Sequence, residues 1–178
     1  MVIDEPLLHL ASAAALGLLL GSAGLHKRRD PQGFALIFAD YRAALGYLLP
    51  VRLASLLPGM ELLAAAAVLA SPWQPFAALP AVALLALYAL VLAIVAWRGT
   101  PIADCGCHFG GRPQPPGSAL VLRNLLLLLP ALTLLVPMGD RALVWFDAIT
   151  LAFVLAGSWV LYRLAHLLIS NRVSLREL

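Results

Sequence analysis

The sequence predicts an all-α, polytopic membrane protein that forms one integral membrane domain over residues 1–178. Of the 178 residues, 62% are hydrophobic and only 12% are charged, whereas soluble domains are roughly half apolar and about a quarter charged. The mean hydropathy is +0.93. The apolar residues also form several runs close to the ~20 residues that cross a bilayer as a helix. Together these observations predict a bundle of membrane-spanning helices.

Five apolar runs are candidates for the spans. The first is too long for a removed signal peptide, and it lacks the basic start and the cleavage site of one. The turns after the second and fourth runs are short, so the helices on either side of each turn should pack antiparallel. We therefore expect a four-helix core plus a fifth span. The predicted spans cover residues of about 7–26, 52–71, 76–97, 118–136 and 144–168.

Residues 30–49 predict a helix that does not cross the membrane. Asp30 is a good N-cap residue and Pro31 suits the first helical turn. Apolar side chains recur at helical spacing, but Asp40 and Arg42 interrupt any span. We expect an amphipathic helix that lies along the membrane surface or folds over the bundle. It is either a plain connection or a lid over a site.

The positive charges indicate an orientation. With five spans, the segments after the first and third spans share one side with the C-terminus, and most basic residues fall there. The positive-inside rule places that side in the cytoplasm. The net charge of +3 follows from this orientation, so no nucleic-acid partner is expected. The basic residues on that side are Lys27, Arg28, Arg29, Arg42, Arg52, Arg98, Arg112, Arg172 and Arg176.

The polar segment 99–117 contains both cysteines of the chain, Cys105 and Cys107, within "DCGCHFGG". A disulfide between them closes a small ring that departs from relaxed geometry, so it should be easy to reduce. Positive neighbours such as His108 and Arg112 favour the thiolate that attacks a disulfide. A bridge across one residue would stabilise the fold very little. The pattern therefore favours a catalytic dithiol over a structural staple.

Metal binding and an inert pair are the alternatives to this dithiol. Cys105, Cys107 and His108, with His26 on the same face, could hold Cu(I) or Zn(II). A structural zinc site would need a second ligand pair, which the sequence lacks. On this alternative, the protein is a non-enzymatic scaffold or a Cu/Zn-handling subunit of an assembly complex.

Polar residues within the apolar runs are expected to support the cysteine site. Ionisable groups are costly inside a membrane and are often functional there. Glu61 lies deep in the second span, and we expect it to pair with Lys27 or Arg123 from another helix. Five residues should converge at the end of the bundle that carries the cysteine segment, with Glu61 beneath the others: His26, Lys27, Glu61, Arg123 and Asn124.

Four stretches together resemble the MauE family of methylamine-utilisation membrane proteins. They are "GLLLGSAGLHKRRDPQGFALIFADYR", "LLPGMELLAAAAVL", "DCGCHFGG" and "RNLLLLL". The resemblance covers most of residues 16–130, and the first half also resembles the wider DoxX-like group. His108 lengthens the family's "CGCFG" by one residue.

The resemblance implies a redox role in the bacterial inner membrane. Family members are thought to support disulfide formation or electron transfer in the maturation of periplasmic proteins, such as the small subunit of methylamine dehydrogenase. They often work beside a thioredoxin-like partner. Such clients require the cysteines on the periplasmic face, whereas the charge pattern places them on the cytoplasmic face. The side of the cysteine segment therefore stays open.

The mechanism that we expect is thiol–disulfide exchange. One cysteine forms a mixed disulfide with a partner protein, and the other cysteine resolves it. The electrons then pass to another thiol protein, or to a quinone that enters near Glu61 and Arg123. The polar, glycine-rich cysteine segment suits the docking of a protein and favours the first acceptor.

Overall fold

The computed structural model describes residues 4–46, 49–99 and 118–174, and the regular elements in these ranges are all helical. A short 3₁₀ helix, η3, leads directly into α4. The bounds are α1 Pro6–Arg29, α2 Pro31–Leu45, α3 Arg52–Ala70, η3 Pro75–Ala78, α4 Leu79–Arg98, α5 Ser118–Thr133 and α6 Trp145–Ser174. The prediction of an all-α fold is confirmed.

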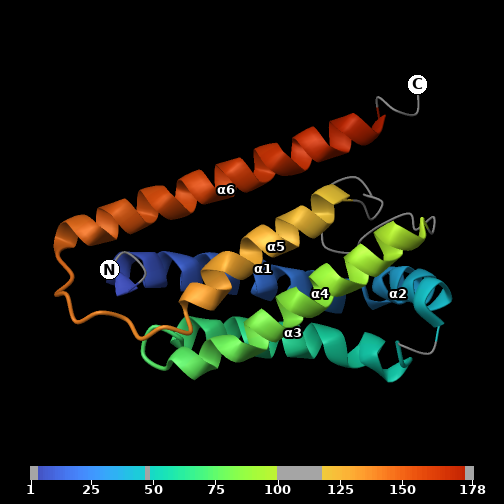
Figure 1. Cartoon of the computed structure of the whole chain (residues 1–178), viewed down its shortest axis with the longest axis horizontal. Coiled ribbons are helices and arrows are strands. Elements are labelled where there is room, and N and C mark those ends of the chain that lie inside the picture. Colours follow the sequence, from blue (N-terminus) through green and yellow to red (C-terminus); the bar gives the residue numbers. More distant parts are fainter. Residues whose placement is uncertain (1–3, 47–48, 100–117, 175–178) are drawn as a thin grey trace.

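Four helices, α1, α3, α4 and α5, form the core of the bundle, and α6 runs along its outside against α1 (Figure 1). Three segments are long and apolar enough to cross a membrane: Pro6–Arg29, Arg52–Ala70 and Pro75–Arg98. They correspond to the first three predicted spans. The apolar stretches Ser118–Thr133 and Trp145–Leu161 are shorter. That the fourth and fifth runs also cross the membrane stays a prediction.

The helices α1 and α3 pack closely because glycines line their seam. A Cβ atom added at Gly17 would lie 2.8 Å from the Leu69 side chain, and one at Gly24 would lie 2.9 Å from the carbonyl oxygen of Pro58. Small residues of this kind let two helix backbones approach in a membrane. The same Cβ at Gly24 would lie 3.1 Å from Glu61 Cβ. The seam thus brings α1 against the one acidic residue of α3.

The helix α2 folds over one end of this core. The Asp30 carboxylate accepts a hydrogen bond from the Gly33 backbone N–H at 2.9 Å, and the helix ends before Gly46, whose φ is +64°. A positive φ of this size favours glycine. The buried face of α2 packs against α4 and α5 in one cluster of Phe38, Tyr41, Leu45, Leu49, Leu92, Val95 and Leu120.

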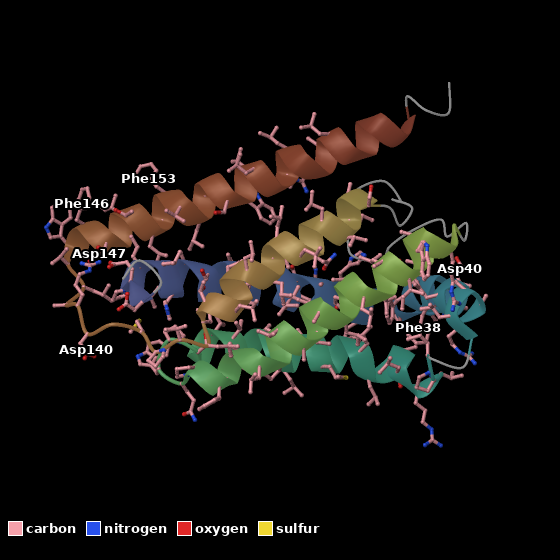
Figure 2. All side chains as sticks on the ribbon, in the orientation of Figure 1. Phe38, Asp40, Asp140, Phe146, Asp147 and Phe153 are labelled. Carbon is pink, nitrogen blue, oxygen red and sulfur yellow. The ribbon has the colours of Figure 1, made fainter. Side chains whose placement is uncertain are left out.

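The two ends of the bundle differ in composition. At one end, called here the α2 end, α1 and α4 finish, and α3 and α5 begin (Figure 1). This end carries Arg28, Arg29, Arg42, Arg52 and Arg98. At the opposite end lie Asp140 and Asp147, while Phe146 and Phe153 of α6 point away from the core (Figure 2).

Candidate functional site: a buried ion pair at the α2 end

Lys27 and Glu61 form an ion pair inside the helix bundle. The Glu61 side chain is fully buried and that of Lys27 is 4% exposed, and the Lys27 ammonium donates to Glu61 Oε1. Gly24 lies one turn before Lys27 and touches α3 at Glu61, which places the two side chains within reach. Of the two partners that the sequence offered for Glu61, the structure selects Lys27 rather than Arg123.

Two aromatic residues complete this cluster. The Tyr88 hydroxyl of α4 donates a hydrogen bond to Oε1 of Glu61. The Lys27 ammonium lies 5.4 Å from the ring centroid of Phe34 and 5.3 Å from that of Tyr88. Both distances fall in the range of cation–π attraction. The site is therefore built by α1, α2, α3 and α4 together.

Sequence reasoning missed Tyr88 and Phe34. A signal for Tyr88 was present, because it is the single hydroxyl-bearing residue in the apolar run 76–97. A lone hydroxyl in a span usually finds a polar partner on another helix. Phe34 gave no such signal, since an aromatic residue on an amphipathic helix most often serves packing alone.

The buried pair is energetically demanding. Removing two charges from water costs several kcal/mol per ion, and their attraction offsets this only with good geometry and further hydrogen bonds. Here Tyr88 supplies one such bond. Within the described residues, Glu61 Oε2 has no hydrogen-bond partner. A pair of this kind inside a helix bundle is typical of a functional site.

A cavity opens beside the ion pair, between α2, α3 and α4. It has about 600 Å³ of empty space, including its mouth. Lys27 forms part of its wall, and the remaining lining is apolar or aromatic. The lining residues are Lys27, Phe34, Ile37, Phe38, Tyr41, Leu49, Leu53, Leu57, Leu87, Tyr88, Val91 and Leu92.

The other predicted supporting residues lie outside the ion pair. Asn124 is 3% exposed, and its side-chain N–H donates at 2.9 Å to the carbonyl of Leu120 in its own helix. Arg123, on the same helix, is half-buried, and its Nε has no hydrogen-bond partner among the described residues. His26 is exposed in the last turn of α1. All three belong to the α2 end.

The cysteine segment itself lies outside the described residues, together with Cys105, Cys107, His108 and Arg112. The residues that flank it, Gly99 and Ser118, are at the α2 end. No group of three or more His, Cys, Asp or Glu side chains that could hold a metal occurs in the described part of the chain. That finding does not test the metal alternative for the cysteines.

A second charged cluster lies at the opposite end and is exposed. Arg141 donates to Glu5 Oε1 at 2.8 Å and to both carboxylate oxygens of Asp147 at 3.1 and 3.0 Å. Hydrogen bonds to Asp147 and then to Glu5 raise the pKa of Arg141. This cluster ties the start of α6 to the start of α1. Its side chains are 42% exposed for Arg141 and 40% for Glu5.

Together, the fold and the site define a polytopic membrane helix bundle with a charged cluster inside it. The family model "Methylamine utilisation protein MauE" matches residues 5–137, and the chain belongs to this family.

Three curated relatives carry the name "Methylamine utilization protein MauE". The protein of Paracoccus denitrificans is 36% identical over 73% of this chain and 69% of its own length. That of Paracoccus versutus is 34% identical over 74% of this chain and 70% of its own length. That of Methylophilus methylotrophus is 31% identical over 60% of this chain and 55% of its own length, so the match leaves much of that relative uncovered. No solved structure matches the chain.

Proposed function

We propose that the chain is a thiol–disulfide redox protein of the bacterial inner membrane, with Cys105 and Cys107 as its redox pair. It would support the maturation of a partner protein in methylamine utilisation, such as a methylamine dehydrogenase-type client. Family membership supports the metabolic setting. The observation that carries the proposal is the buried Lys27–Glu61 pair at the end of the bundle where the cysteine segment is attached.

Covalent connectivity supports a link between the cysteines and the buried ion pair. Cys105 is six residues beyond Gly99, and six residues of extended chain reach about 20 Å. The cysteines are thus tethered to the α2 end, which holds the ion pair and most of the basic residues. A positive environment lowers the pKa of a thiol and favours the thiolate nucleophile. His108 and Arg112 supply positive charge beside the cysteines in the sequence, and His26 lies at the same end.

The proposed reaction balances as a two-electron exchange. A client thiolate attacks one sulfur of the Cys105–Cys107 disulfide, and the other cysteine leaves as a thiolate. The second client thiol then attacks the mixed disulfide, so the client gains a disulfide and the pair is left as two thiols. Two electrons and two protons have moved from the client to the pair. A two-electron acceptor, a thioredoxin-like disulfide or a quinone, must then reoxidise it.

The test is a redox titration of the purified protein in glutathione buffers, followed by alkylation of free thiols and mass spectrometry. We expect both thiols to appear in one two-electron step, at a potential above the roughly −300 mV of structural disulfides. Cys105→Ser and Cys107→Ser are the controls, and each should abolish the step without loss of the folded bundle.

Two results would overturn the proposal. Thiols that stay free at every potential would show that Cys105 and Cys107 do not form a redox pair. Stoichiometric copper or zinc in the purified protein, lost in both serine variants, would instead establish the metal-handling alternative with Cys105, Cys107 and His108 as ligands.

The side of the membrane is a separate part of the proposal. The basic residues of the α2 end favour the cytoplasm, and the maturation of periplasmic clients requires the periplasm. A membrane-impermeant thiol reagent applied to spheroplasts separates the two. Labelling in intact spheroplasts places the cysteines outside, and labelling only after lysis places them inside.

A further inference from the structure

The cavity beside Lys27 has an unusual lining for a gap between apolar helices. Four of its twelve lining residues are aromatic, compared with 8% of the whole chain. They are Phe34, Phe38 and Tyr41 from α2, and Tyr88 from α4. Aromatic walls suit a flat ring, because offset and edge-to-face ring contacts are favourable. The second large cavity, between α1, α5 and α6, has one aromatic residue and no charged residue in its lining.

Lys27 gives this cavity a hydrogen-bond donor. An ammonium has three N–H donors, and within the described residues its one hydrogen-bond partner is Glu61. The Lys27 side chain is 4% exposed and forms part of the cavity wall. An oxygen of a bound molecule could accept a remaining N–H, while Glu61 neutralises the lysine charge. An acyl chain would make no use of this donor.

The cavity reaches the outer face of the bundle. Leu87 of α4 belongs to its lining and is 38% exposed. Because α4 is one of the helices long and apolar enough to cross a membrane, a molecule entering beside Leu87 would come from the bilayer.

We propose that this cavity binds the ring of a lipid-soluble quinone, with Lys27 donating a hydrogen bond to one ring oxygen. A quinone combines the required features: it is flat, apolar, soluble in the bilayer and bears an oxygen acceptor. As an electron acceptor for the cysteine pair, it would take two electrons and two protons to become the quinol while the two thiols become a disulfide. That redox role rests on the proposed function, whereas the binding does not.

The binding is tested in the Cys105→Ser/Cys107→Ser protein, which cannot exchange disulfides. A photoreactive azido derivative of a short-chain ubiquinone is cross-linked to this protein in nanodiscs, and the labelled peptides are identified by mass spectrometry. We expect labels on α2 and α4 that an excess of decylubiquinone removes. A naphthoquinone analogue used as a second competitor shows which ring class fits better.

Three further variants of the double-serine protein keep this test independent of folding. Val91→Phe fills the cavity and keeps both residues of the ion pair, and Leu155→Phe fills the other cavity as the matched control. Lys27→Met/Glu61→Gln removes the donor without leaving a lone buried charge. Affinity should fall about tenfold or more with Val91→Phe and with the Lys27/Glu61 change, as expected for a lost hydrogen bond to a charged group or a blocked site. Leu155→Phe should leave affinity unchanged.

Several results would overturn the cavity assignment. These are labels confined to α5 and α6, labelling that is equal with and without Val91→Phe, and displacement by saturated phospholipid as readily as by quinone. The outcomes for the redox function are distinct. If the double-serine protein binds quinone but the wild type shows no exchange activity, the quinone site is supported and the redox function is wrong. If the wild type shows exchange activity but no quinone binds, the redox function is supported, the quinone site is wrong, and a thiol protein is the favoured acceptor.

Discussion

Both ends of the bundle carry a basic side chain paired with carboxylate, but their surroundings are opposite. At the α2 end the side chains of Lys27 and Glu61 are 4% and 0% exposed. At the other end the side chains of Arg141 and Glu5 are 42% and 40% exposed. The same ionic chemistry therefore has different consequences. The exposed cluster is screened by solvent and salt, whereas the buried pair depends on its partners and on close helix packing.

The packing explains why only one pair is buried. Gly24 allows α1 to approach α3 directly beside Glu61, and α2 then folds back over Lys27 through Phe34. Arg141 lies in the connection between α5 and α6, and its side chain stays 42% exposed. A burial this complete is typical of a site that serves function, because an apolar pair would fill the same space at less cost.

The largest effect is expected from Lys27→Met. It leaves Glu61 buried without its cation, and loss of one partner of a buried pair costs about 3–5 kcal/mol. Lys27→Met/Glu61→Gln should recover most of this loss, because the amide is neutral and its oxygen still accepts from Tyr88. Unfolding in mixed detergent micelles measures both variants. Equal stability of Lys27→Met and the wild type would show that the pair is not buried as described.

The next effect concerns the glycine seam. Gly24→Ala places a methyl group 2.9 Å from the Pro58 carbonyl, and overpacking of this kind costs about 1–3 kcal/mol. Gly59→Ala is the matched control, since nothing lies within 4 Å of its added Cβ. It should be neutral or stabilise α3 by up to about 1 kcal/mol. If the two alanine variants unfold alike in the same assay, the close approach of α1 and α3 is wrong.

Tyr88→Phe should lower stability by at most about 3 kcal/mol, the upper value for a hydrogen bond to a charged group, and by less than Lys27→Met because Glu61 keeps its cation. The ring that lines the cavity is retained, so quinone binding should change less than with Val91→Phe. Unfolding and cross-linking on the same preparation compare the two effects. A quinone affinity that falls more with Tyr88→Phe than with Val91→Phe would assign the contact to the hydroxyl.

The smallest effect is expected from Arg141→Gln. This side chain is exposed, so its loss should alter stability less than any variant above, and added salt should erase the difference. The pKa of Arg141 is raised in the folded protein. Stability from this group is thus complete below its unfolded pKa and declines only as pH rises through the folded value, far above neutrality. Unfolding across the neutral pH range should show no dependence on Arg141, and a clear one would contradict the exposed character of this cluster.

Much of this architecture could be predicted from the sequence, because helices in a membrane need long apolar runs. The run 7–26 corresponds to α1, and the amphipathic pattern of 30–49 contains α2. Lys27 as a partner of Glu61 was also predictable, since a lone buried charge needs an opposite one. The cavity and the contact of the Phe34 ring with Lys27 were not predictable. They depend on how α2 and α4 are rotated against each other, which tertiary packing determines.

The proposed disulfide exchange between the cysteines and a partner protein is tested most directly by covalent trapping in cells. Cys105→Ser and Cys107→Ser proteins are isolated from cells grown on methylamine after acid quenching and thiol alkylation. We expect one of the two serine variants to carry a partner protein through a disulfide that dithiothreitol releases, and the double-serine protein to carry none. Absence of any such adduct in both single variants, with their remaining cysteine alkylated as a free thiol, would contradict it.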